Sequence, residues 1–309
     1  MPLFMRKALL AVKKETTYGT DSVPTGTQAY LVRNLSITPL ANTSASRDLV
    51  RPYYGNFENI ALDTHVECQF EVELQSSGTK GTVPAFGDAL LACGMAATTV
   101  AATSVTYTPV STSFDAVTIY FNMDGVLHKM TGARGSVSVS VARGAIPTLS
   151  FSFQGLYSTP TDTAALTPTF TAFKAPLGPN VQNTPTFSLH GASSPMESFS
   201  MDIANSLVFR SLPGGAEQVL ITDRKPTGSV SFEATTIATK DWFTISKANT
   251  LGALSLIHGT ADGFKVEIAA PKVQLDGLSY SDSDGIAMLN SNLIFTPNTG
   301  NDEFTIAFK

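Results

Sequence analysis

Residues 117–130 read VTIYFNMDGVLHKM, and this stretch decides the fold class. Apolar side chains alternate with other residues on both sides of an Asp124-Gly125 pair. Alternation with a period of two is typical of half-buried strands, and Asp-Gly favours the positive φ angles of a two-residue hairpin turn. The stretch therefore predicts two strands joined by a tight turn. The same alternation recurs in Phe70–Leu74, Val137–Val141 and Leu149–Phe153.

Helical patterns are confined to two short segments. Residues 84–94 (PAFGDALLACG) place Pro84 in the first turn, apolar residues at helical spacing and Gly94 just past the end, the positions that Pro and Gly prefer. Residues 239–252 form the second segment, which holds the single tryptophan, Trp242. The rest reads as strand, turn or loop, so the sequence predicts an all-β fold with two small helices.

The chain is poor in charge. Of its 309 residues 43% are apolar, enough for a large core, but only 15% are charged, against about 25% in typical soluble domains. Solvent-facing positions must therefore be largely neutral and hydroxylated, or covered by other subunits. The net charge of −5 arises in the second half, because residues 1–155 carry 11 basic and 11 acidic side chains and residues 156–309 carry 9 and 14. A protein that grips DNA would need a basic surplus.

Several classes of function lack the residues that they require. No apolar run reaches the roughly 18 residues of a membrane-spanning helix. Cys68 and Cys93 belong to no metal-binding cluster, and we interpret them as small buried apolar residues in a reduced compartment. The four histidines lie far apart, and no catalytic motif or nucleotide-binding loop is present. We therefore expect a protein that is not an enzyme and uses no cofactor or metal.

Three carboxylates share one face of a predicted strand. Glu67, Glu71 and Glu73 alternate with Cys68, Phe70 and Val72, so they lie opposite the apolar face. Such a row suits a solvated strand face, a glycosidase site or the wall of a water-filled lumen. Glycosidase carboxylates usually come from different elements around an aromatic cleft, which disfavours the second interpretation.

The chain divides into two portions of similar length. Residues 158–185 are rich in Thr, Pro and Ala and sustain neither period, so they form a predicted linker between domains at 1–157 and 186–309. Each domain shows an alternating strand, a loop, a second strand, a helix and a closing pair of strands. Residue identity between the portions is low, so we predict a duplication of element order.

A long loop in the first portion combines arginines with aromatic residues. Residues 47–59 hold them among Gly and Asn, which is an unusual composition for a plain surface loop. Arginine and aromatic side chains are enriched at the centres of protein interfaces. We therefore predict an inter-subunit contact made by Arg47, Arg51, Tyr53, Tyr54 and Phe57.

Two segments carry a resemblance to a known family. LLAVKKETTYGT (residues 9–20, followed by Pro24-Thr25) and GTKGTVP (78–84) with LLACG (90–94) resemble segments of bacteriophage tail tube (major tail) proteins of long-tailed phages. Together they cover the first third of the chain. The resemblance implies two tandem tail-tube-type β-sandwich or barrel domains, each with a short flanking helix. It also implies rings whose inner strands form one continuous β-barrel.

The function implied by the resemblance is structural. Rings would stack through long loops and terminal arms into a tube that conducts DNA into the host. Family members commonly have one such domain and form hexamers, so two domains imply a homotrimer with pseudo-sixfold symmetry. The implied location is the tail of the virion, here of the non-contractile type, after assembly in the host cytoplasm.

The resemblance also implies partners. These are other copies of the chain and tail proteins such as the tape measure and terminator proteins, with no membrane involved. Genome DNA would pass without specific binding, because every neutralised phosphate would add binding energy that stalls passage. Glu67, Glu71 and Glu73 are then candidates to face the lumen.

Two other classes of protein remain as alternatives. A virion decoration or adhesin protein with two Ig-like sandwich domains would explain the Ser and Thr content, and would be a stable monomer with exposed aromatic loops. A carbohydrate-active β-sandwich enzyme would need paired carboxylates in an aromatic cleft, and one tryptophan in a predicted helix gives it little support. Assembly into rings distinguishes the tail tube from both.

Overall fold

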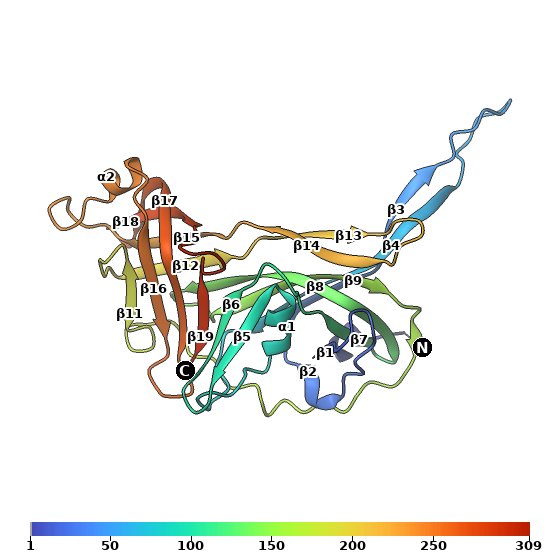
Figure 1. Ribbon diagram of the computed structural model, residues 1–309, viewed down its shortest axis with the longest axis horizontal. Coiled ribbons are helices and arrows are strands. Elements are labelled where there is room, and N and C mark those ends of the chain that lie inside the picture. The colour runs from blue at the N-terminus through green and yellow to red at the C-terminus, as the bar shows by residue number, and fades with distance from the viewer. Residues whose placement is uncertain (1) are drawn as a thin grey trace.

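The computed structural model describes residues 2–309 and consists almost entirely of β-strands (Figure 1). The all-β prediction is confirmed. Up to residue 157 the elements are the 3-10 helices η1 (Met5–Lys7) and η2 (Gly26–Gln28), β1 (Ala8–Lys14), β2 (Ala29–Tyr30), β3 (Arg33–Ser46), β4 (Asn59–Glu73), α1 (Gly87–Ala92), β5 (Met95–Val100), β6 (Ser104–Pro109), β7 (Val117–Met123), β8 (Val126–Ala142) and β9 (Thr148–Tyr157).

The later elements begin with a two-residue strand in the predicted linker. They are β10 (Thr161–Asp162), β11 (Thr186–Leu189), β12 (Met196–Asp202), β13 (Asn205–Arg210), β14 (Gln218–Arg224), β15 (Thr227–Glu233), α2 (Trp242–Lys247), β16 (Gly252–His258), β17 (Val266–Ser283), β18 (Ile286–Phe295) and β19 (Thr305–Phe308).

The hairpin predicted from residues 117–130 is present as β7 and β8, which pair antiparallel. Asp124 and Gly125 in its turn have φ angles of 47° and 108°. Both angles lie in the left-handed region, which Gly adopts freely and Asp tolerates better than most residues. The turn chemistry therefore fixes the register of the two strands.

Both predicted helices form, and each is shorter than its sequence pattern. α1 stops before Gly94, whose φ of 76° is the left-handed conformation that ends helices. α2 begins after Asp241, whose side chain accepts the backbone N–H of Thr244 at 2.9 Å. These caps fix the helix ends inside the wider apolar patterns.

The strands of the two portions pair in corresponding orders. In the first portion the order is β3-β4-β9-β8-β7-β1. In the second it is β12-β15-β18-β17-β16-β11. All neighbouring strands are antiparallel. In each set, a helix follows the strand that is third along the chain. The short strands β10 and β19 pair with β8 and β17, respectively. We call these strand sets the first and second β-units.

Strand β8 joins the first β-unit to the second. Its first half pairs with β7, and residues 138–142 of its second half pair with β12. Strands β6 and β19 form another connection near the C-terminus. Two of the open strand edges are the outer edge of β3 and the side of β17 residues 276–283 that faces away from β18.

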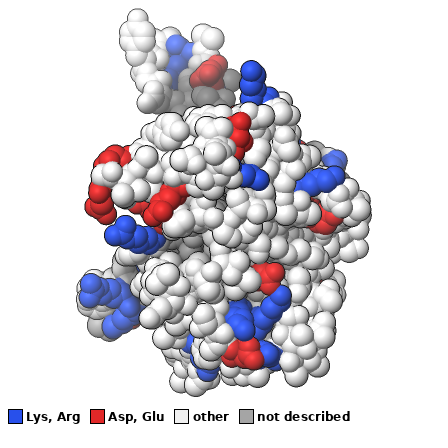
Figure 2. Space-filling model, turned by 90° about the vertical axis from the view of Figure 1, so that its left-hand side faces the viewer, with Lys and Arg blue, Asp and Glu red and all other residues white. Residues whose placement is uncertain are grey.

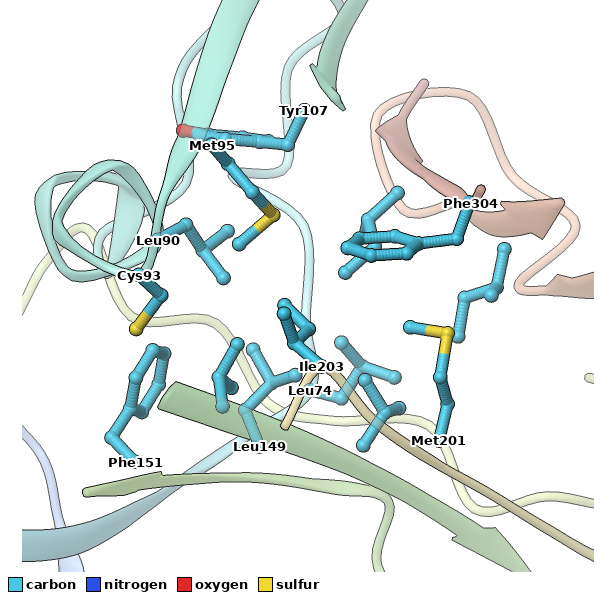
Figure 3. Packing of buried hydrophobic residues seen from close by; sticks show 14 of the residues in the cluster. Leu74, Leu90, Cys93, Met95, Tyr107, Leu149, Phe151, Met201, Ile203 and Phe304 are labelled. Carbon is cyan, nitrogen blue, oxygen red and sulfur yellow. The ribbon is translucent and has the colours of Figure 1, made fainter. Parts of the chain in front are cut away.

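One hydrophobic core extends through both β-units. Leu90 of α1 and Phe151 of β9 belong to the same buried cluster as Met201, Ile203 and Phe304 from the second portion (Figure 3). Truncating such a side chain to alanine costs about 2–5 kcal/mol of stability. The packing therefore fixes how the two units lie on one another.

Both cysteines belong to this core. Cys68 and Cys93 are free and buried, and burial raises the pKa of the Cys68 thiol to about 12. A thiol with so high a pKa carries almost no thiolate at neutral pH. Their interpretation as small apolar core residues is confirmed.

The predicted linker runs along the lower side of the molecule in Figure 1 and is fastened to both units. Phe173 packs edge-on against Tyr30 with ring centroids 5.8 Å apart. Further on, the Leu177 carbonyl oxygen lies 3.0 Å from Nε2 of His258. The domain boundaries at residues 157 and 186 stay a prediction.

Candidate channel face and assembly surfaces

A continuous polar face runs across both β-units on the side opposite the core. Seven strands, β4-β9-β8-β12-β15-β18-β17, contribute alternate residues to it, and the pairing registers align these residues in rows. We call it the serine face. One complete row, in that strand order, is Glu73, Thr148, Ser140, Ser200, Ser229, Asn292 and Asp276.

The serine face follows from the period of two along each strand. Phe70, Phe151 and Val139 point into the core, so their sequence neighbours point the other way. Those neighbours are mostly Ser, Thr and Asn, which bond to one another and to water. Ser200 and Ser229 illustrate this, with hydroxyl oxygens 2.8 Å apart. Short neutral side chains thus make a smooth hydrophilic surface.

Glu67, Glu71 and Glu73 all lie on the serine face, as their alternation predicts. Glu71 accepts a hydrogen bond from Nδ2 of Asn34 at 2.9 Å and lies 4.0 Å from the Arg33 guanidinium. The alternation in β4 predicts this strand of the face, but the neighbouring strands were not predicted. The signal was present in SVSVSVA (136–142), where alternate serines belong to the same face.

Charge is sparse on the molecular surface as well as in the composition. Figure 2 shows the end of the molecule that carries β11, β16, β17, β18 and α2, where charged side chains are scattered over a mostly uncharged surface. The ion pair between Arg143 and Asp284, 3.6 Å apart, is exposed. Exposed pairs of this kind add about 0–1 kcal/mol of stability. Assembly therefore has few charges to desolvate here.

The β3–β4 hairpin projects from the body as an arm and carries the predicted contact loop at its tip (Figure 1). The Arg51 guanidinium lies over the rings of Tyr53 and Phe57, 4.7 and 4.1 Å from their centroids. Arg47 instead pairs with Glu58, and Tyr54 is fully exposed. The tip thus brings together three of the five predicted residues, and its aromatic surface is uncovered in the monomer.

The β13–β14 hairpin lies across the first β-unit. Val219 and Ile221 face the body and are 0% and 8% exposed. The backbone N–H of Val219 donates to the Tyr18 hydroxyl at 2.6 Å, and Nη1 of Arg134 donates to the Val219 carbonyl at 2.8 Å. Tyr18 belongs to the N-terminal motif, so one role of that motif is to hold this hairpin.

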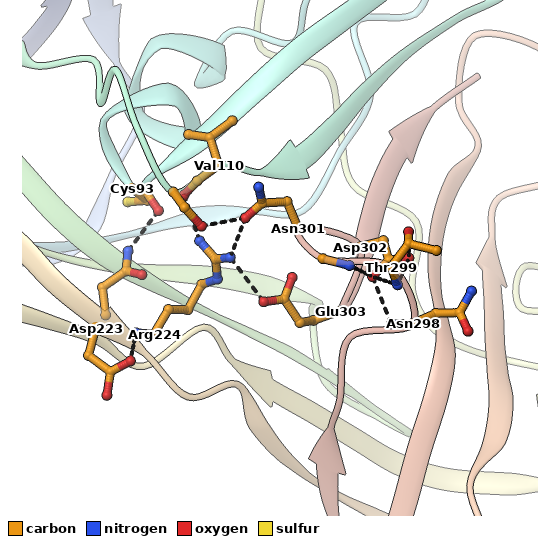
Figure 4. A network of polar contacts seen from close by, with 12 residues as sticks. Cys93, Val110, Asp223, Arg224, Asn298, Thr299, Asn301, Asp302 and Glu303 are labelled. Atoms are coloured by element: carbon orange, nitrogen blue, oxygen red, sulfur yellow. Dashed lines mark hydrogen bonds and ion pairs between the residues drawn. The ribbon is translucent and has the colours of Figure 1, made fainter.

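A buried ion pair fastens the base of the same hairpin. Nη2 of Arg224 donates to Glu303 at 3.0 Å, and Nη1 donates to the Val110 carbonyl at 2.8 Å (Figure 4). The two side chains are only 9% and 12% exposed. Breaking a buried pair leaves an uncompensated charge, so this contact opposes detachment of the base of the hairpin.

A family model described as phage tail tube protein matches residues 5–290. The chain belongs to the phage tail tube protein family. No curated protein matches it.

Membership assigns this tail tube protein a structural, non-enzymatic role in the virion tail, where it assembles with copies of itself and with other tail proteins. No helix in residues 2–309 is long and apolar enough to cross a membrane. In the same range, no group of three or more His, Cys, Asp or Glu residues could hold a metal ion.

Proposed function

We propose that three copies of this tail tube protein close into a ring by repeating the β8–β12 junction between subunits, and that rings stack into the tube. The observation that carries the proposal is that the open edges of β17 and β3 match the two strands of the internal junction. The free part of β17 is the counterpart of the part of β8 that pairs with β12, and β3 is the counterpart of β12. Each subunit would therefore add β3 to β17 of its neighbour.

The register of this junction follows from the internal one. Val139 of β8 lies opposite Leu149, and Tyr280 of β17 lies opposite Leu289. Leu149 lies opposite the penultimate residue of β4, and Leu289 lies opposite the penultimate residue of β15, the counterpart of β4. Val139 and Tyr280 are therefore counterparts.

The partner position on β3 is found in the same way. Met201 of β12 lies opposite Val139 across the internal junction. Ile37 lies opposite Cys68 of β4, and Met201 lies opposite Gly228 of β15. Cys68 and Gly228 each come four residues before the penultimate residue of their strand. Ile37 is therefore the counterpart of Met201. Ile37 of one subunit is thus expected opposite Tyr280 of the next.

A ring of three such chains contains six β-units, which gives pseudo-sixfold symmetry with two kinds of junction. Closure would pair the open edges of β3 and β17 with each other, and unpaired strand edges otherwise promote uncontrolled association. The inner barrel would take β3, β4, β9, β8, β12, β15, β18 and β17 from each chain.

The serine face is the surface that we assign to the lumen. Its rows carry hydroxyls, amides and carboxylates, so phosphate groups would find little to bind and DNA would pass without specific contacts. The two units would line the channel unequally, since the counterparts of Glu67 and Glu71 in β15 are Thr227 and Ser231. The tape measure and terminator proteins remain the expected partners, with assembly in the host cytoplasm and a non-contractile tail.

Electron microscopy of assembled tubes tests the proposal. Averaged rings should show threefold symmetry with six similar lobes, and native mass spectrometry of released rings should give three times 32.7 kDa. Rings of six chains, or protein that stays monomeric at high concentration with other tail components present, would overturn it.

A further inference from the structure

The β13–β14 hairpin of the second unit corresponds to the distal part of the β3–β4 arm in the first. β13 follows β12 and β14 precedes β15, so this hairpin prolongs the strand pair that is the counterpart of β3 and β4. The hairpin is packed on the unit before it, whereas the arm is free. Accordingly, Val219 and Ile221 are 0% and 8% exposed, and Ile60 and Leu62 in the arm are 50% and 52% exposed.

The surface under the β13–β14 hairpin has a counterpart in the second unit. Arg134, under that hairpin, donates to the Phe114 carbonyl at 2.9 Å. Arg134 follows the residue of β8 that pairs with the first residue of β7, and Gln274 follows the residue of β17 that pairs with the first residue of β16. Gln274 is therefore the counterpart of Arg134. Its Nε2 donates to Asn249 Oδ1 at 2.8 Å, which repeats the contact with the segment before that strand.

This second surface is open and partly apolar. Leu251, in the segment before β16, is 43% exposed, and within residues 2–309 no hairpin covers it as β13–β14 covers the first unit. In a ring, the unit before each β3–β4 arm is the second unit of the neighbouring subunit. An uncovered surface and an undocked arm thus occur in the same chain, in matching places.

From this match we infer that the stem of the arm, at Ile60 and Leu62, packs on the second β-unit of the preceding subunit beside Gln274, Asn249 and Leu251. The inference rests on the proposed ring. It adds a contact within the ring that the pairing of strand edges does not require. The tip, with Arg51 and Tyr53, lies beyond this contact and stays available to a neighbouring ring.

Disulfide trapping in assembled tubes tests the inference. Leu62→Cys combined with Leu251→Cys should form an inter-subunit disulfide under mild oxidation, while either substitution alone should not. Native Cys68 and Cys93 are buried and contribute little background. If this pair stays reduced while Ile37→Cys with Tyr280→Cys becomes oxidised, the arm inference is wrong and the ring proposal stands. If neither pair forms, the ring itself is wrong.

A matched pair of charge substitutions gives a second readout. Leu62→Glu would place a carboxylate in the apolar contact, so we expect the concentration needed for assembly to rise about tenfold or more. Ala61→Glu, on the other side of the same strand, should change it less than about twofold. Thermal melting of both monomers checks that each folds. Equal assembly of the two variants would contradict the inference.

Discussion

Val139 and Tyr280 hold the same position in the two β-units, and one is buried while the other is exposed. Val139 lies opposite Met201 across the internal junction and is 1% exposed. Tyr280 is 62% exposed, beside the unpaired edge of β17. Because the surrounding strand order is the same, the difference comes from the neighbouring unit that Val139 has and Tyr280 lacks. The exposure of Tyr280 indicates what ring closure would cover.

The first prediction concerns this contact. We expect Ile37→Cys combined with Tyr280→Cys to form a disulfide between subunits in assembled tubes. Directly opposed residues of antiparallel strands have Cα atoms about 4.5–5.5 Å apart, within the range that a disulfide spans. Denaturing gels without reductant should show covalent trimers. The control is Ile37→Cys with Asp282→Cys, which is two residues out of register and should remain mostly monomeric. Equal oxidation of both pairs would contradict the proposed register of β3 and β17.

The arm tip provides the second prediction. Replacing residues 51–56 by a short Gly-Ser linker should leave the monomer folded, because Arg51 contacts Tyr53, Phe57 and the Asn56 carbonyl, all within the tip. Rings should still form through β3 and β17, but stacking into long tubes should fail. Sedimentation and electron microscopy would separate rings from tubes. Tubes of normal length would exclude the tip from the contact between rings.

Local sequence patterns predicted the features of this fold that depend on interactions between residues close together in the chain. The β7–β8 turn and the helix end at Gly94 depend on the conformations of single residues, which sequence reveals directly. The alternation around Glu67 likewise predicted one strand of the serine face. The full row from Glu73 to Asp276 depends on strand pairings between distant parts of the chain, which no local pattern specifies.

The shared core and the docking of the β13–β14 hairpin could not be predicted from the sequence either. Low identity between the portions hid the counterparts, since Arg134 is matched by Gln274 and Val139 by Tyr280. Packing between the units depends on shape complementarity among residues such as Phe151 and Met201, far apart in the chain. The correspondence between the two β-units is found from the pairing registers of their strands and not from their residue types.

The third prediction concerns the motif residue Tyr18. Its hydroxyl accepts the N–H of Val219, and burial raises its pKa, so it stays neutral and bonded at physiological pH. Tyr18→Phe would leave that buried N–H without a partner, and we expect a loss of about 1–3 kcal/mol of unfolding free energy. Urea denaturation of the monomer measures it. Tyr157→Phe, at an exposed position, is the control, and equal losses would contradict a special role for Tyr18.

The final prediction concerns the neutrality of the serine face. Ser140 and Ser200 are neighbours in one row, across the junction between the units. Lysines at both positions would add six positive charges to each proposed ring of three, and phosphates would bind them with release of counterions. Tubes should still assemble, because both residues lie away from the core and the open edges. We expect the rate of DNA ejection from phage carrying Ser140→Lys and Ser200→Lys to fall about tenfold or more at low salt and to recover at high salt. Ser140→Gln with Ser200→Gln adds bulk without charge and should eject DNA at nearly the normal rate. If the lysine and glutamine variants eject DNA equally well at low salt, the serine face does not line the path of the DNA.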